Sequence, residues 1–214
     1  MSSQLDHIVI TAPELGAGVR RVEAALGVSL AAGGSHPDMG THNRLLRLSD
    51  STYLEVIAPD PAATLQPARP RWFNLDRMAA DEVPLLAGWV ARCDDIHVAR
   101  TYCADEVGPV QSMTRGDLAW QMAVRTDGEF PLDGAAPALI EWETAVHPAA
   151  TLPDAGCSLV ELRLYHPDPE LVYGILTNMD MQARPTVHWS GDEPAHLAAI
   201  INTPTGQRTL KGRI

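Results

Sequence analysis

The sequence predicts an α+β fold built from repeated βαβββ units. A short apolar strand followed by an amphipathic helix occurs three times along the chain, and further short strands follow each helix. The 214 residues are 45% hydrophobic and 20% charged, which is the usage of an ordinary globular protein. A chain of this size buries enough surface to fold without disulfides or a structural metal.

The first unit begins with the predicted strand 5–11 (LDHIVIT), an apolar run rich in β-branched residues. Apolar residues then recur at helical spacing over 15–26, and Gly27 stands where helices commonly end. Thr11 and Glu14 have the spacing of a capping box at the start of this helix. Further strands are predicted at residues 29–32, 43–48 and 53–58.

The second and third units repeat this pattern. The strand 86–93 (LAGWVARC) precedes Asp94 and Asp95, which are suited to begin a helix. The strand 158–165 (SLVELRLY) precedes Asp168 at the start of another helix. Further strands are predicted at residues 110–114, 118–125, 138–143, 186–189 and 196–202.

We expect one single domain over residues 1–214. Its three units have the approximate bounds 4–60, 85–147 and 157–212, and the last unit is partial. Residues 61–84 form a connector with little regular structure, because residues 59–84 hold five of the 17 prolines.

The charge balance excludes two classes of partner. With 16 Lys and Arg against 27 Asp and Glu, the net charge is −11, which disfavours nucleic acid and anionic membranes. No apolar stretch reaches roughly 20 residues, and the N-terminus does not have the pattern of a signal peptide. The three cysteines form no C-x-x-C pair, which predicts a cytoplasmic protein with reduced thiols. No glycine-rich phosphate motif is found, so no nucleotide cofactor is expected.

The repeated unit, whose first strand begins Leu-Asp-His, resembles the vicinal oxygen chelate superfamily. The segments LDHIVIT, GTHNRLLRL, YLEVIA, PRWFNLD, LAGWVAR, MTRG and LIEWETAVHP are similar to its glyoxalase-like branch. This resemblance implies two units whose mixed sheets curl around a shared cavity for a small-molecule ligand. It also implies a possible homodimer.

In the superfamily a divalent metal, where present, is held by side chains from the first and last strands of each unit. Carried over by position, the resemblance implies His7, Glu55 and Glu141 as ligands, with Trp89 at the fourth position. Such a set would suit Zn, Mn, Ni, Co or Fe(II) and leave positions open for substrate. Glu141 or Glu55 could also act as a catalytic base.

Each of these residues also has a structural interpretation. His7 could be a neutral ligand or a hydrogen-bonded core histidine. Glu55 lies on an apolar strand face where burial requires a partner, unless that face is solvated. Glu141 shares its face with Glu143, which allows a wet surface as well as a site.

Substrate-binding residues are expected in two loops. Gly33 and Gly34 precede the segment 36–43 (HPDMGTHN), which contains Gly40, and glycines allow backbone conformations closed to other residues. This segment could present His42 and Asn43 at a cavity mouth or be an ordinary hairpin, with His36 on the surface. Arg71 and Trp72 could hold an anionic, partly apolar metabolite, or the segment could fold inward as a plug. Trp142 could belong to the core or to the pocket.

Two functions follow. The first is a metal-assisted lyase, isomerase or dioxygenase that acts on a small oxygenated metabolite, and the pair His7 and Glu55 favours it. The alternative is a metal-free protein that sequesters a ligand, as drug-resistance members of the superfamily do. Trp89 favours this alternative, because tryptophan cannot bind a metal.

Overall fold

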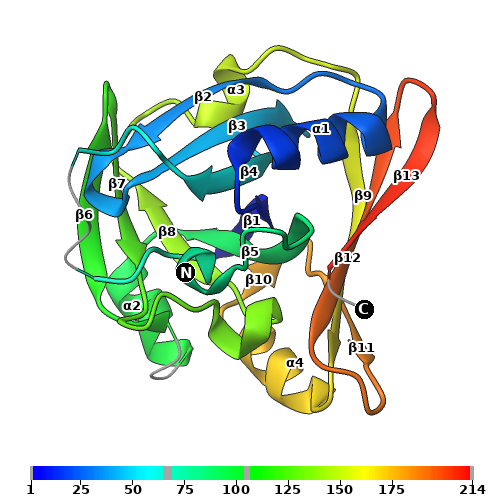
Figure 1. Ribbon diagram of the computed structural model, residues 1–214. Coiled ribbons are helices and arrows are strands. Elements are labelled where there is room, and N and C mark those ends of the chain that lie inside the picture. Colours follow the sequence, from blue (N-terminus) through cyan, green and yellow to red (C-terminus); the bar gives the residue numbers. More distant parts are fainter. Residues whose placement is uncertain (1, 65–68, 104–106, 213–214) are drawn as a thin grey trace.

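The computed structural model describes residues 2–64, 69–103 and 107–212 of the chain. Its strands form two sheets flanked by short helices (Figure 1). The large sheet contains β1 (Ser3–Thr11), β2 (Ala31–His36), β3 (Thr41–Arg47), β4 (Tyr53–Pro59), β5 (Leu85–Cys93), β6 (Val110–Arg115), β7 (Leu118–Ala123), β8 (Ala138–Trp142) and β10 (Met181–Gln182). The small sheet contains β9 (Ser158–His166), β11 (Thr186–Trp189), β12 (His196–Thr203) and β13 (Gly206–Lys211).

Short helices connect these strands and cover them. The α-helices are α1 (Leu15–Leu26), α2 (Ile96–Tyr102), α3 (Pro148–Thr151) and α4 (Pro169–Asn178). Single 3-10 turns are η1 (Pro37–Met39), η2 (Leu75–Arg77) and η4 (Pro131–Gly134). None of the helices in these described ranges is long and apolar enough to cross a membrane.

The large sheet confirms the predicted α+β class and the curled sheet. Its strand order is β2-β3-β4-β1-β5-β8-β7-β6, with β10 beside β1. Within the first unit β4 runs parallel to β1, within the second β8 runs parallel to β5, and β1 and β5 pair antiparallel. The two units therefore form matching halves of one sheet, which curls until its edge strands β2 and β6 approach each other (Figure 1).

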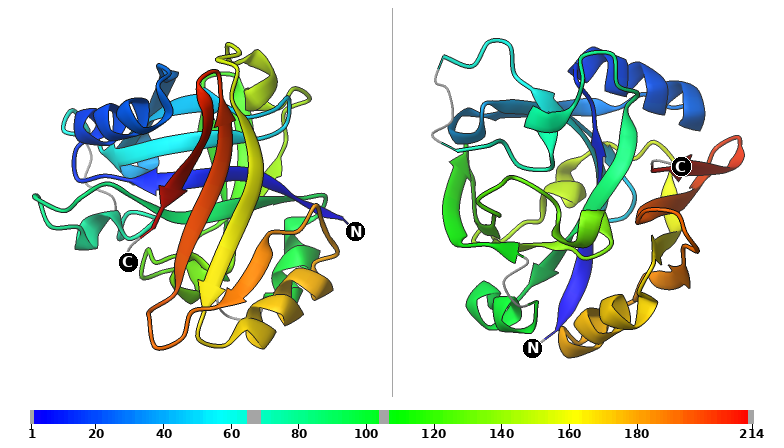
Figure 2. Two further views of the ribbon diagram at one scale, coloured as in Figure 1. Left: turned by 90° about the vertical axis from the view of Figure 1, so that its right-hand side faces the viewer. Right: turned by 60° about the horizontal axis from the view of Figure 1, so that its bottom comes forward.

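The third unit departs from the repeat. Its first strand, β9, pairs in parallel with β11 and antiparallel with β12, and β13 extends the sheet beyond β12. The small sheet packs against β5 and α1, with its strands crossing those of the large sheet (Figure 2).

Both faces of the large sheet are buried, which explains why its central strands are almost continuously apolar. Along β1, Ile8 and Ile10 face outward into the core shared with the helices and the small sheet. Val9 faces the interior of the curled sheet, where Trp72 and Phe73 belong to the same cluster. The connector that carries Trp72 thus folds inward as a plug.

The helix ends follow local chemistry with one exception. Gly27 ends α1 in the left-handed conformation with φ 72°. The Asp95 carboxylate accepts hydrogen bonds from two backbone N–H groups at the start of α2, and Asp168 accepts one at the start of α4. The predicted capping box of α1 is wrong. Glu14 itself occupies the N-cap and makes no side-chain capping bond, because Thr11 ends β1.

Candidate active site

A β-bulge in β1 lies beside the polar centre of the large sheet. The pairing of β1 with β5 shifts register between Leu5 and His7, which leaves Asp6 as the extra residue. Asp6 and His7 are both buried, and the His7 Nδ1 atom lies 2.7 Å from Asp6 Oδ1. The carboxylate therefore accepts a hydrogen bond from Nδ1, which makes Nε2 the acceptor atom in the neutral form of the ring.

Asp6 is fully buried and accepts hydrogen bonds from three further groups through its Oδ2 atom. These donors are Trp142 Nε1 at 2.9 Å, His147 Nε2 at 2.9 Å and Arg92 Nη1 at 3.4 Å. Burial by itself raises the pKa of Asp6, but hydrogen bonds from His147 and His7 outweigh it and hold the pKa well below its ordinary value. Asp6 is therefore an ionised anchor that sets the orientation of His7.

His7 and Glu55 are diagonal neighbours on the inner face of the adjacent strands β1 and β4. The His7 Nε2 atom lies 3.6 Å from Glu55 Oε2, and both side chains are about 5% exposed. Asn43 Nδ2 donates a hydrogen bond of 2.6 Å to the other oxygen of Glu55, Oε1. Two acceptor atoms that face each other in a buried site repel unless a proton or a donor group lies between them.

The polar chain continues to the seam between the two edge strands. Arg115 Nη1 donates to His36 Nε2 at 3.0 Å and to Asn43 Oδ1 at 3.4 Å. His36 therefore carries its proton on Nδ1, from which it donates to Thr41 Oγ1 at 3.1 Å. Burial, followed by the charge of Arg115, lowers the pKa of His36 to about 3, so this ring stays neutral.

Two glycines make room for this chain. A Cβ atom at Gly33 would lie 2.0 Å from Asn43 Oδ1, and one at Gly34 would lie 3.0 Å from Arg115 Cδ. Of Gly33, Gly34 and Gly40, only Gly40 has a positive φ, at 56°. At Gly33 and Gly34 the missing side chain provides space for Asn43 and Arg115.

The structure does not bring Glu141 to His7 and Glu55. Ile140 of β8 faces the interior, so Glu141 points to the outer face. There its Oε2 atom accepts a 2.8 Å hydrogen bond from the backbone N–H of Ile96, at the start of α2. Sequence alone could not decide this, because a shift of one residue exchanges the two faces of a strand.

The strand register shows what the second unit offers in place of a metal ligand. His7 is paired with Tyr53, two residues before Glu55, and Val90 is paired with Ala138, two residues before Ile140. The counterparts of His7 and Glu55 are thus Val90 and Ile140, which have no donor atoms. Trp89, at the expected fourth position, belongs to the outer core. Across the described ranges, no three His, Cys, Asp or Glu side chains are grouped so that they could hold a metal ion.

The predicted substrate-binding residues fall into two groups. Asn43, Trp72 and Trp142 lie in or beside the interior, where Trp142 packs on Trp120 with ring centroids 5.5 Å apart. His42 and Arg71 instead line a separate cavity of about 430 Å³ near the start of α1. Arg71 is already ion-paired with Asp76 there, at 2.6 Å.

Sequence reasoning missed four residues of the polar chain. Arg115 and His147 were given no part in the site, and His36 was expected on the surface. Asp6 carried a usable signal, because an acidic residue inside an apolar strand requires buried partners. The other three have no local signal, since their partners come from distant strands.

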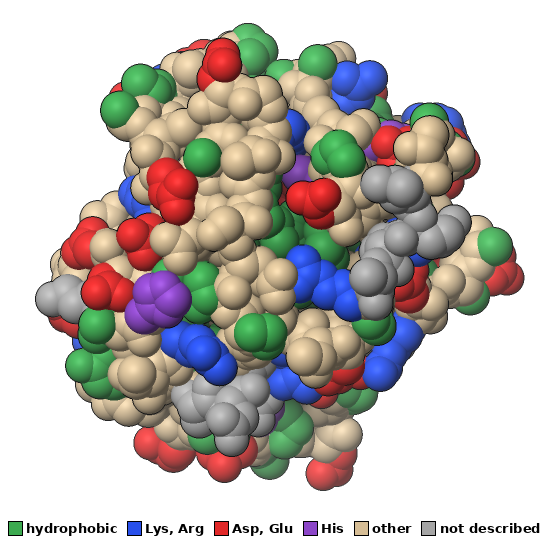
Figure 3. All heavy atoms as spheres, turned by 90° about the vertical axis from the view of Figure 1, so that its left-hand side faces the viewer, with side chains coloured by type: hydrophobic (Ala, Val, Ile, Leu, Met, Phe, Trp, Pro, Cys, Tyr) green, Lys and Arg blue, Asp and Glu red, His purple; other side chains and the backbone are tan. Residues whose placement is uncertain are grey.

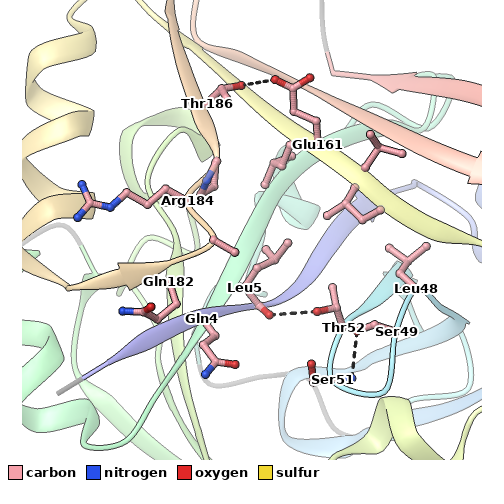
Figure 4. A pocket seen from close by; sticks show the side chains of 15 residues that line it. Gln4, Leu5, Leu48, Ser49, Ser51, Thr52, Glu161, Gln182, Arg184 and Thr186 are labelled. Atoms are coloured by element: carbon pink, nitrogen blue, oxygen red, sulfur yellow. Dashed lines mark hydrogen bonds between the residues drawn. The ribbon is translucent and has the colours of Figure 1, made fainter.

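A cavity between the two sheets is lined by none of the residues of the polar chain described above. Its volume is about 530 Å³, and it is lined by the start of β1, the β3–β4 turn, β9 and the segment before β11 (Figure 4). Thr186 donates a hydrogen bond of 2.8 Å to Glu161, while Arg184 points away toward α4 (Figure 4).

Figure 3 shows the face of the molecule on the side of β6, where acidic and basic side chains are interspersed.

The chain matches the model of a known family, described as a glyoxalase-like domain, over residues 5–179. It belongs to the glyoxalase-like domain family. The predicted resemblance to a glyoxalase-like branch is thereby confirmed. No match was found among curated proteins for this glyoxalase-like chain.

One solved structure shares the fold, and two others are more distantly similar. A hypothetical protein from Staphylococcus aureus matches with a TM-score of 0.56 and 15% identity, over 99% of this chain and 85% of that protein. A methylmalonyl-CoA epimerase in complex with methylmalonyl-CoA and NH4+ matches with a TM-score of 0.45 and 16% identity, over 68% and 99% of the two chains. The methylmalonyl-CoA epimerase from Mycobacterium tuberculosis matches with a TM-score of 0.40 and 17% identity, over 69% of this chain and 91% of that protein. Likenesses this remote carry no information about the reaction of the glyoxalase-like chain.

Proposed function

We propose that this chain is an isomerase-type enzyme that moves a proton between neighbouring carbon and oxygen atoms of a small oxygenated metabolite. The observation that carries the proposal is the buried pair His7 Nε2 and Glu55 Oε2, which face each other at 3.6 Å. Each is held from behind, His7 by Asp6 and Glu55 by Asn43. Groups fixed in this way are suited to general acid–base catalysis.

The short distance between the two groups restricts the reaction. Reacting atoms approach to about 3–3.5 Å, so two bases on opposite faces of one carbon would need to be about twice as far apart. At 3.6 Å, His7 and Glu55 address adjacent atoms from the same side. One group takes a proton from a carbon next to a carbonyl, and the other exchanges a proton with the neighbouring oxygen. The substrate class is therefore a hydroxy-carbonyl compound.

A resident divalent metal, which the superfamily resemblance implies, does not fit the donor set. His7 and Glu55 supply two donors, whereas catalytic metal sites usually have three protein ligands. No step of the proposed reaction passes through a metal. We expect elemental analysis of protein purified without affinity-tag metal to find far less than about one equivalent of any transition metal. A stoichiometric ion that is lost in His7→Ala would contradict this.

Deuterium exchange tests the proposed reaction. Dihydroxyacetone, glyceraldehyde and hydroxypyruvate are incubated with the protein in D2O, and loss of the C–H signal next to the carbonyl is followed by proton NMR. We expect catalysed exchange with at least one compound, abolished in His7→Ala and Glu55→Gln. The control variant Asp50→Asn, at an exposed ion pair with Arg47, should keep it. Exchange at the protein-free rate with all three compounds would refute the proposal.

A second candidate function is sequestration of a ligand without reaction. It is favoured by the aromatic interior, where the buried Trp72 Nε1 donor has no hydrogen-bond partner among the described residues. Binding of a hydroxy-carbonyl compound in titration calorimetry without any exchange would favour this candidate.

A further inference from the structure

Arg115 is a cation at the inner seam of the large sheet that has no carboxylate partner. It donates hydrogen bonds to a neutral imidazole, that of His36, and to the amide oxygen of Asn43. Within the described ranges no Asp or Glu oxygen is ion-paired with it, whereas Arg71 and Arg92 are each paired with a carboxylate. In a protein with a net charge of −11, a half-buried cation without an acidic partner is unusual.

The unused part of the guanidinium has the geometry that carboxylates bind. Both hydrogen bonds of Arg115 come from one nitrogen, Nη1. Nε and Nη2 make no hydrogen bond within the described part of the chain. These two adjacent N–H groups form the fork that binds a carboxylate in a bidentate manner.

The environment holds this fork in place and leaves its charge available. His36 is neutral and accepts from Arg115, so it anchors the guanidinium and adds no competing charge. Gly34 lies against the Arg115 side chain, where a Cβ atom would approach its Cδ to 3.0 Å. Asn43 contacts Arg115 through its oxygen and Glu55 through its nitrogen, so a single amide joins the cation to the proposed reacting pair.

We infer that the substrate of this site is a carboxylic acid, whose carboxylate Arg115 binds through Nε and Nη2 while its hydroxy-carbonyl portion faces His7 and Glu55. This inference rests on the proposed function. It makes Arg115 a specificity-determining residue, and it narrows the substrate class to short hydroxy-oxo acids. A neutral hydroxy-ketone of the same shape should bind far more weakly.

A matched pair of probes tests the charge requirement. Hydroxypyruvate and dihydroxyacetone share the hydroxy-ketone group. Hydroxypyruvate has a carboxylate where dihydroxyacetone has a hydroxymethyl group. Titration calorimetry should show that hydroxypyruvate binds about 10- to 100-fold more tightly, the effect of one charge-assisted bidentate contact. Arg115→Gln should remove this difference. The control Arg44→Gln alters an exposed arginine next to Asn43 and should leave it intact.

The outcomes separate this inference from the proposed function. If Arg115→Gln does not fold, as judged by circular dichroism, Arg115→Lys retains the charge but not the fork and should bind hydroxypyruvate several-fold more weakly. Arg115-dependent binding without deuterium exchange would support the inference and refute the proposed reaction. Equal binding of the two probes, unchanged affinity in the Arg115 variants, or no binding of hydroxypyruvate to the wild type would overturn the inference.

Discussion

Asp6→Asn is the substitution that most directly tests the buried polar chain. It keeps the shape of the side chain but removes a negative charge that is fully buried. The carboxylate accepts from four side chains, with donor distances from 2.7 to 3.4 Å. An asparagine has one acceptor oxygen, so its amide N–H groups must face at least one former donor.

The expected loss of stability follows from this geometry. Removing one partner from a buried charged network commonly costs about 3–5 kcal/mol. We expect the lower end, about 3 kcal/mol, because His7 can move its proton to Nε2 and accept from the new amide. For a chain of this length, each kcal/mol corresponds to roughly 2–4 °C in Tm. The variant should therefore melt about 6–12 °C below the wild type.

Urea unfolding at pH 7 measures the effect, with Asp50→Asn as the matched control. Asp50 forms an exposed ion pair with Arg47, so its loss should cost less than about 1 kcal/mol. The folded-state pKa of Asp6 is depressed, so its contribution is present above the unfolded pKa of about 3.9 and is lost as the pH falls below it. The wild type and Asp6→Asn should converge in acid. A loss below about 1 kcal/mol at pH 7, or a difference that persists in acid, would refute the reasoning.

Three further predictions concern other parts of the site. Gly33→Ala should lower the free energy of unfolding in urea by about 1–3 kcal/mol and impair ligand binding, because the added Cβ displaces Asn43. The control Gly174→Ala, at an open helix position, should raise the free energy of unfolding by about 0.5–1 kcal/mol. Glu141→Ala should cost about 1 kcal/mol by removing a helix cap while hydroxypyruvate binding is retained, and loss of binding at unchanged stability would argue for a role in the site. His36 is protonated only near pH 3 in the folded protein, against an ordinary pKa of 6.5, so the unfolded chain binds the extra proton and stability should fall as the pH decreases from 6.5 toward 3. His36→Gln should flatten this dependence in a pH series of urea midpoints, and an unchanged slope would assign it to other groups.

Much of the fold could be predicted because it depends on local patterns. The strand that contains His7, the helix that ends at Gly27 and the helix capped by Asp95 all carry their signals within about ten residues. In the third unit the first strand, β9, pairs in parallel with β11 and not with the last strand of the unit. This difference from the first two units was not predictable, because it depends on packing against the rest of the molecule.

The site residues that could be named from the sequence came from the resemblance to the family. It implied His7 and Glu55, and the structure brings their side chains within 3.6 Å of each other. Glu141 was expected beside them but lies on the opposite face, since the turns before β8 decide which of two alternating faces each residue joins.

The sequence by itself indicated the repeated unit, the division of each central strand into two alternating faces, and His7 and Glu55 as candidate site residues. Only the tertiary structure decided that Asp6 anchors His7, that Asn43 links Glu55 to Arg115, and that His36 is a buried neutral partner of this arginine. The physical reason is that these contacts join strands far apart in sequence. A local pattern records which groups must be buried, whereas the curl of the sheet determines which of them meet.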